Sequence, residues 1–253
     1  MHTTAVERTA FGDPIPVKSL AAKPSVFLIL ILLLQPLVAG AQVPAAFPGA
    51  PANLTTMQVQ AKAEEVFERG NYQRAYFIYR EELAPIGDKY SQYMVGYMHL
   101  TGKGVPEDKV VASAWYRLAA ERNTPEFVKA RDELMDALTP EQRDASDRQF
   151  VGLKKQFGDL RLLMNAIRSD YQILKSRTGS KLGSENSPMT IIEPRGMGTA
   201  ASGADFYTRI ERRMGERLDY ISKHTDIEIV DLDPRMLDIG ELEDRVDRNL
   251  ESP

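Results

Sequence analysis

Residues 91–123 contain two short amphipathic segments that flank a glycine-rich loop. Apolar or small residues recur at helical spacing in both segments, which predicts a pair of amphipathic helices: Tyr93, Gly96, Tyr97 and Leu100 in the first, and Ala112, Trp115, Tyr116 and Ala119 in the second. Gly96 and Ala112 are small enough for close helix contact, and Trp115 can fill the space between helix layers. In the loop, Gly102 and Gly104 can adopt positive φ, and Pro106 is suited to a helix start.

The same periodicity extends over residues 58–138. The further stripes are Val59, Ala63, Val66 and Phe67; then Tyr72, Ala75, Tyr76, Tyr79 and Leu83; and last Phe127, Ala130, Leu134 and Leu138. Gly70-Asn71, Pro85 and Gly87 separate them. Five short helices joined by tight turns predict a stacked α/α array, because solenoids repeat with periods of about 30 to 45 residues.

Residues 91–123 closely resemble the Sel-one-like repeat family, a relative of the tetratricopeptide repeats. The residues that define the repeat are Gly96, Gly102, Gly104, Val105, Ala112, Trp115, Tyr116, Ala119 and Ala120. Residues 60–84 look like a degenerate first repeat, and after Asn123 a third begins without its Gly-x-Gly-Val loop. The resemblance implies an all-α solenoid over residues 57–138 that binds a protein or peptide. About three stacked units are needed for stability, so the array requires a cap.

Residues 139–177 are predicted to form one long helix, which begins at Thr139-Pro140-Glu141-Gln142 with a capping box. Apolar residues follow at steps of three and four: Phe150, Leu153, Phe157, Leu160, Met164, Ile167, Tyr171 and Leu174. This 3.5-residue period allows two structures, a coiled-coil homodimer or a helix that folds back on the solenoid. The poor charge pairing of a parallel dimer favours fold-back through Phe150, Leu153 and Phe157, a monomer, and a stretch from Arg168 onward that projects free. The basic stripe of Lys154, Arg161, Arg168 and Lys175 can face an acidic element, including the chain's own tail.

The N-terminus is predicted to be a secretory signal peptide, residues 1–41. Nine apolar residues at 26–34 follow Lys18 and Lys23 and precede Val38-Ala39-Gly40-Ala41, as in a leader that is cleaved. The stretch from Val26 to Ala41 is shorter than the roughly 20 apolar residues of a membrane span. We therefore expect export, to the periplasm rather than to the medium or to an N-terminal anchor, and no stable span after cleavage. Residues 42–56, with three prolines, are predicted to be a flexible lead-in.

The last 76 residues of the chain have a different composition. Residues 178–203 are rich in glycine and serine and are predicted to be a linker, with one short extended piece at 189–193. A C-terminal helix and acidic tail follow at 204–253. The helix has a basic face of Arg209, Arg212, Arg213 and Arg217, which is predicted to be solvated. Residues 227–230 can form a short strand.

No catalytic constellation is evident, and we expect no catalytic residue, cofactor site or metal site. The chain has 253 residues, no cysteine and three histidines; His99 is predicted to pack in the repeat and His224 to lie at a helix C-terminus. The pairs Glu64-Glu65 and Glu81-Glu82 are predicted to lie solvated on helix faces. The pI near 5.6 argues against nucleic-acid binding.

The leading hypothesis is therefore an exported, non-catalytic repeat protein of the cell envelope. Its contacts would come from tyrosines suited to interfaces: Tyr72, Tyr76, Tyr79, Tyr90, Tyr93 and Tyr97. One alternative is a cell-wall or β-lactam-related enzyme, because some secreted members of this family, with cysteine-stapled repeats, are linked to β-lactams. Another is a structural oligomer built on the seam at residues 150–174.

Overall fold

The structure is a computed structural model that describes residues 47–49, 54–178, 190–191, 201–229, 234 and 236–253. All of them belong to one folded unit, Phe47–Pro253. The predicted signal peptide and most of the predicted linker lie outside the described residues, so the structure does not bear on either.

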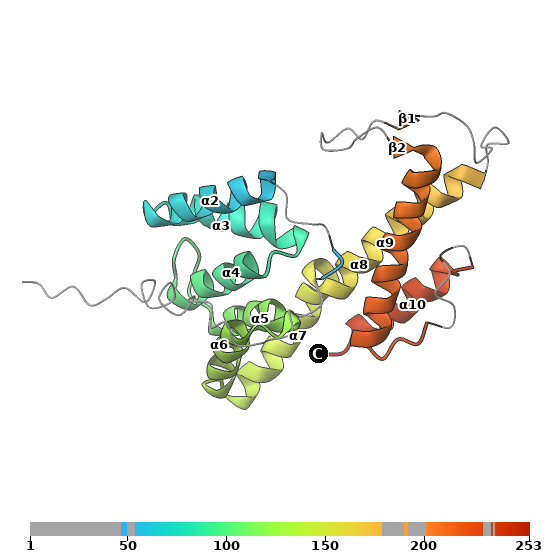
Figure 1. Cartoon of the computed structure of the whole chain (residues 1–253). Helices are drawn as coiled ribbons and strands as arrows, with labels where there is room; N and C mark the ends of the chain where they lie inside the picture. The colour runs from blue at the N-terminus through green and yellow to red at the C-terminus, as the bar shows by residue number, and fades with distance from the viewer. Residues whose placement is uncertain (1–46, 50–53, 179–189, 192–200, 230–233, 235) are drawn as a thin grey trace, which may run out of the picture. The chain divides into compact units, whose positions relative to one another are not determined.

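Stacked helices form the first part of this unit, as the periodicity predicts (Figure 1). They are α2 (Leu54–Glu68), α3 (Tyr72–Phe77), α4 (Lys89–Thr101), α5 (Lys109–Ala119), α6 (Pro125–Asp136) and α7 (Pro140–Phe157). A π-helical turn η1 (Ile78–Leu83) and a short 3-10 turn η2 (Ala84–Ile86) continue α3, and η3 (Ala120–Arg122) continues α5. The predicted all-α, solenoid-like class is confirmed. Residues 54–56, assigned above to the lead-in, are the first residues of α2.

The loop between α4 and α5 has the backbone that its glycines allow. Gly102 and Gly104 have φ of 67° and 79°. A Cβ on Gly104 would lie 2.6 Å from the backbone carbon of Tyr72, so this loop packs directly against the preceding helix pair. Asp108 then caps α5 by accepting hydrogen bonds from the backbone N–H groups of Val110 and Val111 at 2.9 and 3.0 Å.

Close packing inside the α4–α5 pair follows from its small residues. A Cβ on Gly96 would lie 2.6 Å from the Tyr116 ring, and Ala112 is fully buried. Trp115 is 2% exposed and lies 5.3 Å, ring centroid to centroid, from Phe157 of α7. Val105 is half-buried, while Ala119 and Ala120 are buried. Helices α6 and α7 both pack on α5, and they follow it without a further glycine loop.

The predicted single helix over residues 139–177 is wrong, because two helices occupy it. The Thr139–Gln142 capping box starts α7 as expected. Gly158, with ψ of 149°, ends α7, and α8 (Asp159–Thr178) begins at the next residue. Gln92 of α4 donates a hydrogen bond from Nε2 to the Phe157 carbonyl at 3.2 Å, and so satisfies an acceptor at the C-terminal end of α7.

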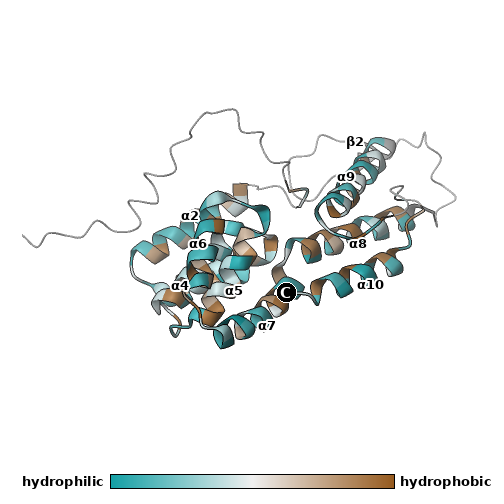
Figure 2. Cartoon of the chain, turned by 90° about the horizontal axis from the view of Figure 1, so that it is seen from below, coloured by the Kyte–Doolittle hydropathy of each residue, from teal (hydrophilic) through white to brown (hydrophobic). Residues whose placement is uncertain are grey.

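The break divides the apolar seam between two partners. Phe150, Leu153 and Phe157 pack on the solenoid core, which confirms the predicted fold-back contact. Leu160, Met164, Ile167, Tyr171 and Leu174 instead pack with α9 (Gly203–His224) and α10 (Ile239–Leu250). Figure 2 shows α9 and α10 on either side of α8. The expectation that the chain projects free from Arg168 onward is therefore wrong.

Charge pairing accompanies this packing. Arg161 pairs with Asp247, and Arg168 pairs with Glu243 at 2.5 Å. The acidic tail thus lies along Arg161 and Arg168 of the basic stripe, which confirms that the stripe can face the chain's own tail. Two-residue strands β1 (Thr190–Ile191) and β2 (Ala201–Ser202) pair antiparallel within the region assigned to the linker. Residues 227–229 form no strand, and residue 230 lies outside the described residues.

Candidate interaction surface

A row of half-buried aromatic rings runs along α4. Tyr90, Tyr93 and Tyr97 recur at intervals of three and four, so they share one face of the helix. Most residues on the other faces of α4, such as Met94, Val95 and Met98, are buried. Tyr93 stacks on Tyr116 of α5 with ring centroids 4.9 Å apart, and on Phe127 of α6 at 5.3 Å. We call the set Phe67, Tyr72, Tyr90, Tyr93, Tyr97 and Phe127 the aromatic face.

One end of the aromatic face already holds an ammonium group. The Lys103 Nζ atom lies 5.2, 5.4 and 5.1 Å from the ring centroids of Phe67, Tyr72 and Tyr97. It also donates a hydrogen bond to the Tyr97 hydroxyl at 3.1 Å. Three rings around one ammonium form a cation–π site. The glycine loop positions this lysine, because Lys103 lies between Gly102 and Gly104.

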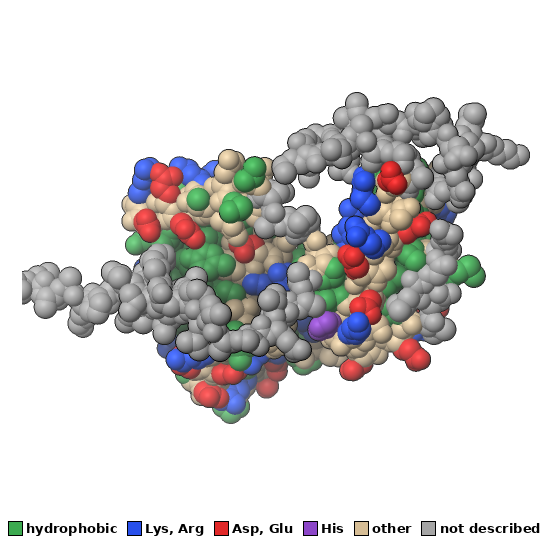
Figure 3. Space-filling view, in the orientation of Figure 1, with side chains coloured by type: hydrophobic (Ala, Val, Ile, Leu, Met, Phe, Trp, Pro, Cys, Tyr) green, Lys and Arg blue, Asp and Glu red, His purple; other side chains and the backbone are tan. Residues whose placement is uncertain are grey.

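Carboxylates border the other end, and we call Glu64, Glu68 and Asp88 the acidic edge. Gln60 of α2 donates to the Asp88 carboxylate at 2.9 Å, which fixes the N-terminal end of α4 beside α2. Figure 3 shows acidic side chains beside the hydrophobic side chains that gather between α2 and α4. Burial raises the pKa of Glu64, and the charges of Glu68 and Asp88 raise it further.

Below the acidic edge lies a hydroxyl without a partner. Tyr79 of η1 is 1% exposed, and its hydroxyl makes no hydrogen bond to any described residue. Its ring meets that of Tyr90 edge-on with centroids 6.4 Å apart. Burial raises the pKa of both tyrosines, and the acidic edge raises them further. This region therefore combines polarizable rings with uncompensated negative charge.

A second cluster of charges is structural. Lys89 of α4, 6% exposed, pairs with Glu121 at 2.6 Å and with Asp159 at 3.0 Å, and Arg122 holds Asp159 through two hydrogen bonds of 2.8 Å. Burial raises the pKa of Glu121. The cluster joins the recognised helix pair to the first turn of α8. The spacing of residues along the sequence does not predict this charge cluster, because its members are far apart in the chain.

The basic face of α9 differs from its prediction. Arg213 pairs with Asp170 of α8 at 2.6 Å, and Arg217, 6% exposed, also pairs with Asp170. The expectation of a solvated face is therefore wrong for Arg217, whose side chain is buried by α8. Arg212 remains largely exposed and pairs only weakly with Glu216 at 4.0 Å.

The histidines make packing contacts. His99 Nε2 lies 3.2 Å from the Tyr76 hydroxyl, and their rings meet edge-on. Burial lowers the pKa of His99. His224 ends α9, where its Nδ1 lies 2.9 Å from the Tyr220 carbonyl and its ring stacks on that of Tyr220. Among the described residues, neither histidine forms a hydrogen bond with a serine or threonine.

The carboxylate pairs separate into different environments. Glu65 is bound by Lys62 and Arg69, and Glu81 by Arg80, whereas Glu64 belongs to the acidic edge. Among the described residues, no group of three or more histidine, aspartate or glutamate side chains is arranged to hold a metal ion.

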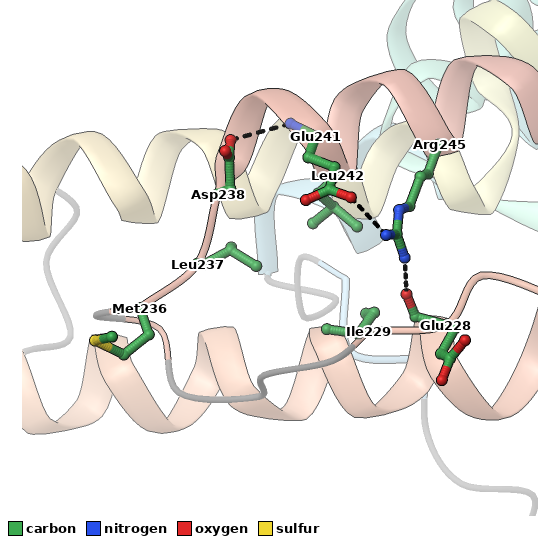
Figure 4. A pocket seen from close by; sticks show the side chains of 8 residues that line it. All are labelled: Glu228, Ile229, Met236, Leu237, Asp238, Glu241, Leu242 and Arg245. Carbon is green, nitrogen blue, oxygen red and sulfur yellow. Dashed lines mark hydrogen bonds and ion pairs between the residues drawn. The ribbon is translucent and has the colours of Figure 1, made fainter.

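Cavities lie in the C-terminal part, and two of them border charged residues described above or the start of α10. One, of about 140 Å³, lies between residues 228–229 and the start of α10 (Figure 4). Arg245 there donates to the Glu228 carbonyl and to Glu241, so its polar groups bind one another. The other, of about 260 Å³, lies where Glu121 and Asp159 meet α9 and α10, and Lys154 beside it donates to the Ser252 carbonyl. Both are best explained as packing junctions.

Comparisons with known proteins give one match. The family model of the Sel1 repeat matches residues 89–124. A search of curated proteins gave no match, and a search of solved structures gave none. None of the described helices is both long and apolar enough to cross a membrane. The matched residues run from the start of α4, through the glycine loop and α5, to the turn before α6. Residues 89–124 of this chain are therefore a Sel1 repeat.

Proposed function

We propose that this chain is an exported, non-catalytic adaptor that binds a protein partner in the cell envelope through its aromatic face. The Sel1 repeat indicates a scaffold for protein–protein interaction. The observation that carries the assignment to this face is the row of half-buried tyrosines on α4, whose side chains combine an apolar ring with a hydroxyl. Such side chains are enriched at interfaces.

Export rests on the sequence of residues 1–41. Protein isolated from its native cells should begin at or near Gln42. An intact N-terminus recovered from the membrane fraction would support an anchor instead. A cytosolic, uncleaved protein would contradict the envelope assignment while leaving the adaptor role in place.

Site-directed photo-crosslinking tests the face. A benzophenone amino acid at Tyr97 should crosslink a protein partner in the native envelope. The same amino acid at Phe77, an aromatic residue of α3 that is 48% exposed, is the matched control. Crosslinking from Phe77 and not from Tyr97 would show that the partner binds elsewhere.

A further inference from the structure

We propose that the acidic edge and Tyr90 bind a lysine or arginine side chain of the partner, so that the adaptor selects a basic segment. This inference rests on the proposed function and adds the chemistry of the partner. It depends on three observations: carboxylates without counter-ions, rings beside them, and an ammonium that the same face already holds.

The carboxylates lack cations among the described residues. Glu64 and Glu68 form no ion pair there, although Lys62 and Arg69 lie on the same helix and pair with Glu65. Asp88 accepts from Gln60 and from the Ser91 hydroxyl, which are neutral donors. Three like charges are thus held close together, and a bound cation would relieve their repulsion.

The rings favour a cationic side chain as the occupant. Tyr90 lies two residues after Asp88, and its ring meets that of Tyr79, whose hydroxyl has no partner among the described residues. Burial raises the pKa of Tyr90, and the charges of the three carboxylates raise it further. A guanidinium or ammonium can contact an aromatic ring and a carboxylate at once, whereas an anion would meet the negative faces of the rings and the acidic edge together.

Lys103 shows that this face accommodates an ammonium. It contacts three rings at the other end of the aromatic face, where Phe67 of α2 and Tyr97 of α4 meet. Phe67 lies three residues after Glu64 and one before Glu68 in α2, so the occupied site and the acidic edge share one helix. The acidic edge and Tyr90 thus offer a cation an aromatic ring, as the Lys103 site does, together with carboxylates.

Short labelled peptides test the proposal. Alanine alternates with lysine in the first peptide, with arginine in the second and with glutamate in the third, and fluorescence anisotropy measures their binding to the purified protein. We expect the lysine and arginine peptides to bind at least about tenfold more tightly than the glutamate peptide, and more weakly as salt screens the contact.

Charge-matched variants separate this surface from the overall negative charge. Glu64→Gln with Glu68→Gln should weaken the basic peptides about fivefold per carboxylate. Glu81→Gln with Glu82→Gln removes the same charge from exposed residues of η1 and should leave binding unchanged. Tyr90→Leu should weaken binding, and Tyr90→Phe, which keeps the ring, should preserve it. Thermal unfolding of each variant verifies that it is folded.

Several results would overturn the inference. Binding of the glutamate peptide as tight as that of the basic peptides would be one such result. Equal effects of the two double variants would be another. If Glu64→Gln with Glu68→Gln instead dissociates a dimer, the occupant is a second copy of this chain and the proposal is wrong. A partner crosslinked at Tyr97 through an acidic or uncharged segment would leave the adaptor role intact and refute this inference alone.

Discussion

Trp115 of α5 lies against Phe157 of α7, with ring centroids 5.3 Å apart and ring planes at 33°. The two side chains are 2% and 7% exposed, and they join the Sel1 repeat to the last turn of the helix that closes the solenoid. Trp115→Ala should lower the free energy of unfolding by about 3 to 5 kcal/mol, because a large buried side chain leaves a cavity. Denaturant titration measures this loss.

Phe77→Ala is the control for that substitution. Phe77 is 48% exposed on α3, so its truncation should cost under about 1 kcal/mol. Equal losses for the two variants would show that Trp115 does not lie in the core described above.

The buried pair of Asp170 and Arg217 should contribute strongly to the C-terminal helices. Asp170→Asn removes the charge that Arg217 and Arg213 contact, and leaves a buried guanidinium uncompensated. We expect a loss of about 3 to 5 kcal/mol in chemical denaturation. Asp219→Asn, which breaks an exposed pair with Lys223, should cost at most about 1 kcal/mol. A small effect at Asp170 would contradict the packing of α8 against α9.

Gly104 and Gly70 offer a matched comparison, because both have φ of 79°. An added Cβ at Gly70 meets nothing within 4 Å, whereas at Gly104 it would lie 2.6 Å from the Tyr72 backbone. Gly70→Ala should therefore cost about 1 to 2 kcal/mol of backbone strain alone. Gly104→Ala should cost clearly more in thermal or urea unfolding. Similar losses would mean that the loop does not pack on Tyr72.

His99 should make stability depend on pH. Burial lowers its pKa in the folded protein, so as pH falls below about 6.5 the unfolded state takes up the proton first and stability is lost. His99→Gln cannot titrate there. The stability advantage of the unsubstituted protein over this variant should shrink between about pH 7 and pH 5. A difference that stays constant over this range in urea titrations would refute the prediction.

We expect a monomer, because the seam that suggested a coiled coil is covered within the chain. Met164 and Ile167 are fully buried against α9 and α10. Light scattering should give the monomer mass at all concentrations. Removing residues 236–253 should uncover Leu163 and its neighbours and cause concentration-dependent association. A stable dimer of the intact chain would restore the oligomer hypothesis.

Local sequence was sufficient for the repeat. Helical spacing, glycines that tolerate positive φ, and the cap at Thr139 act within a few residues, so they can be read directly along the chain. The Sel1 match at residues 89–124 agrees with the repeat inferred from Gly96, Gly102 and Trp115. The same reasoning found the tyrosines of α4, although it left open which of them stay accessible.

Tertiary packing decided the rest. A 3.5-residue seam does not specify its partner, and only the break at Gly158 shows that one half faces the solenoid and the other half faces α9 and α10. The same holds for the charges. The sequence predicts a solvated Arg217, but in the fold Asp170 of α8 lies opposite it and pairs with it. Glu64, Asp88 and Tyr90 form one acidic, aromatic region because Gln60 of α2 holds Asp88 at the start of α4. Side chains far apart in sequence acquire a common environment only when the fold brings their elements together.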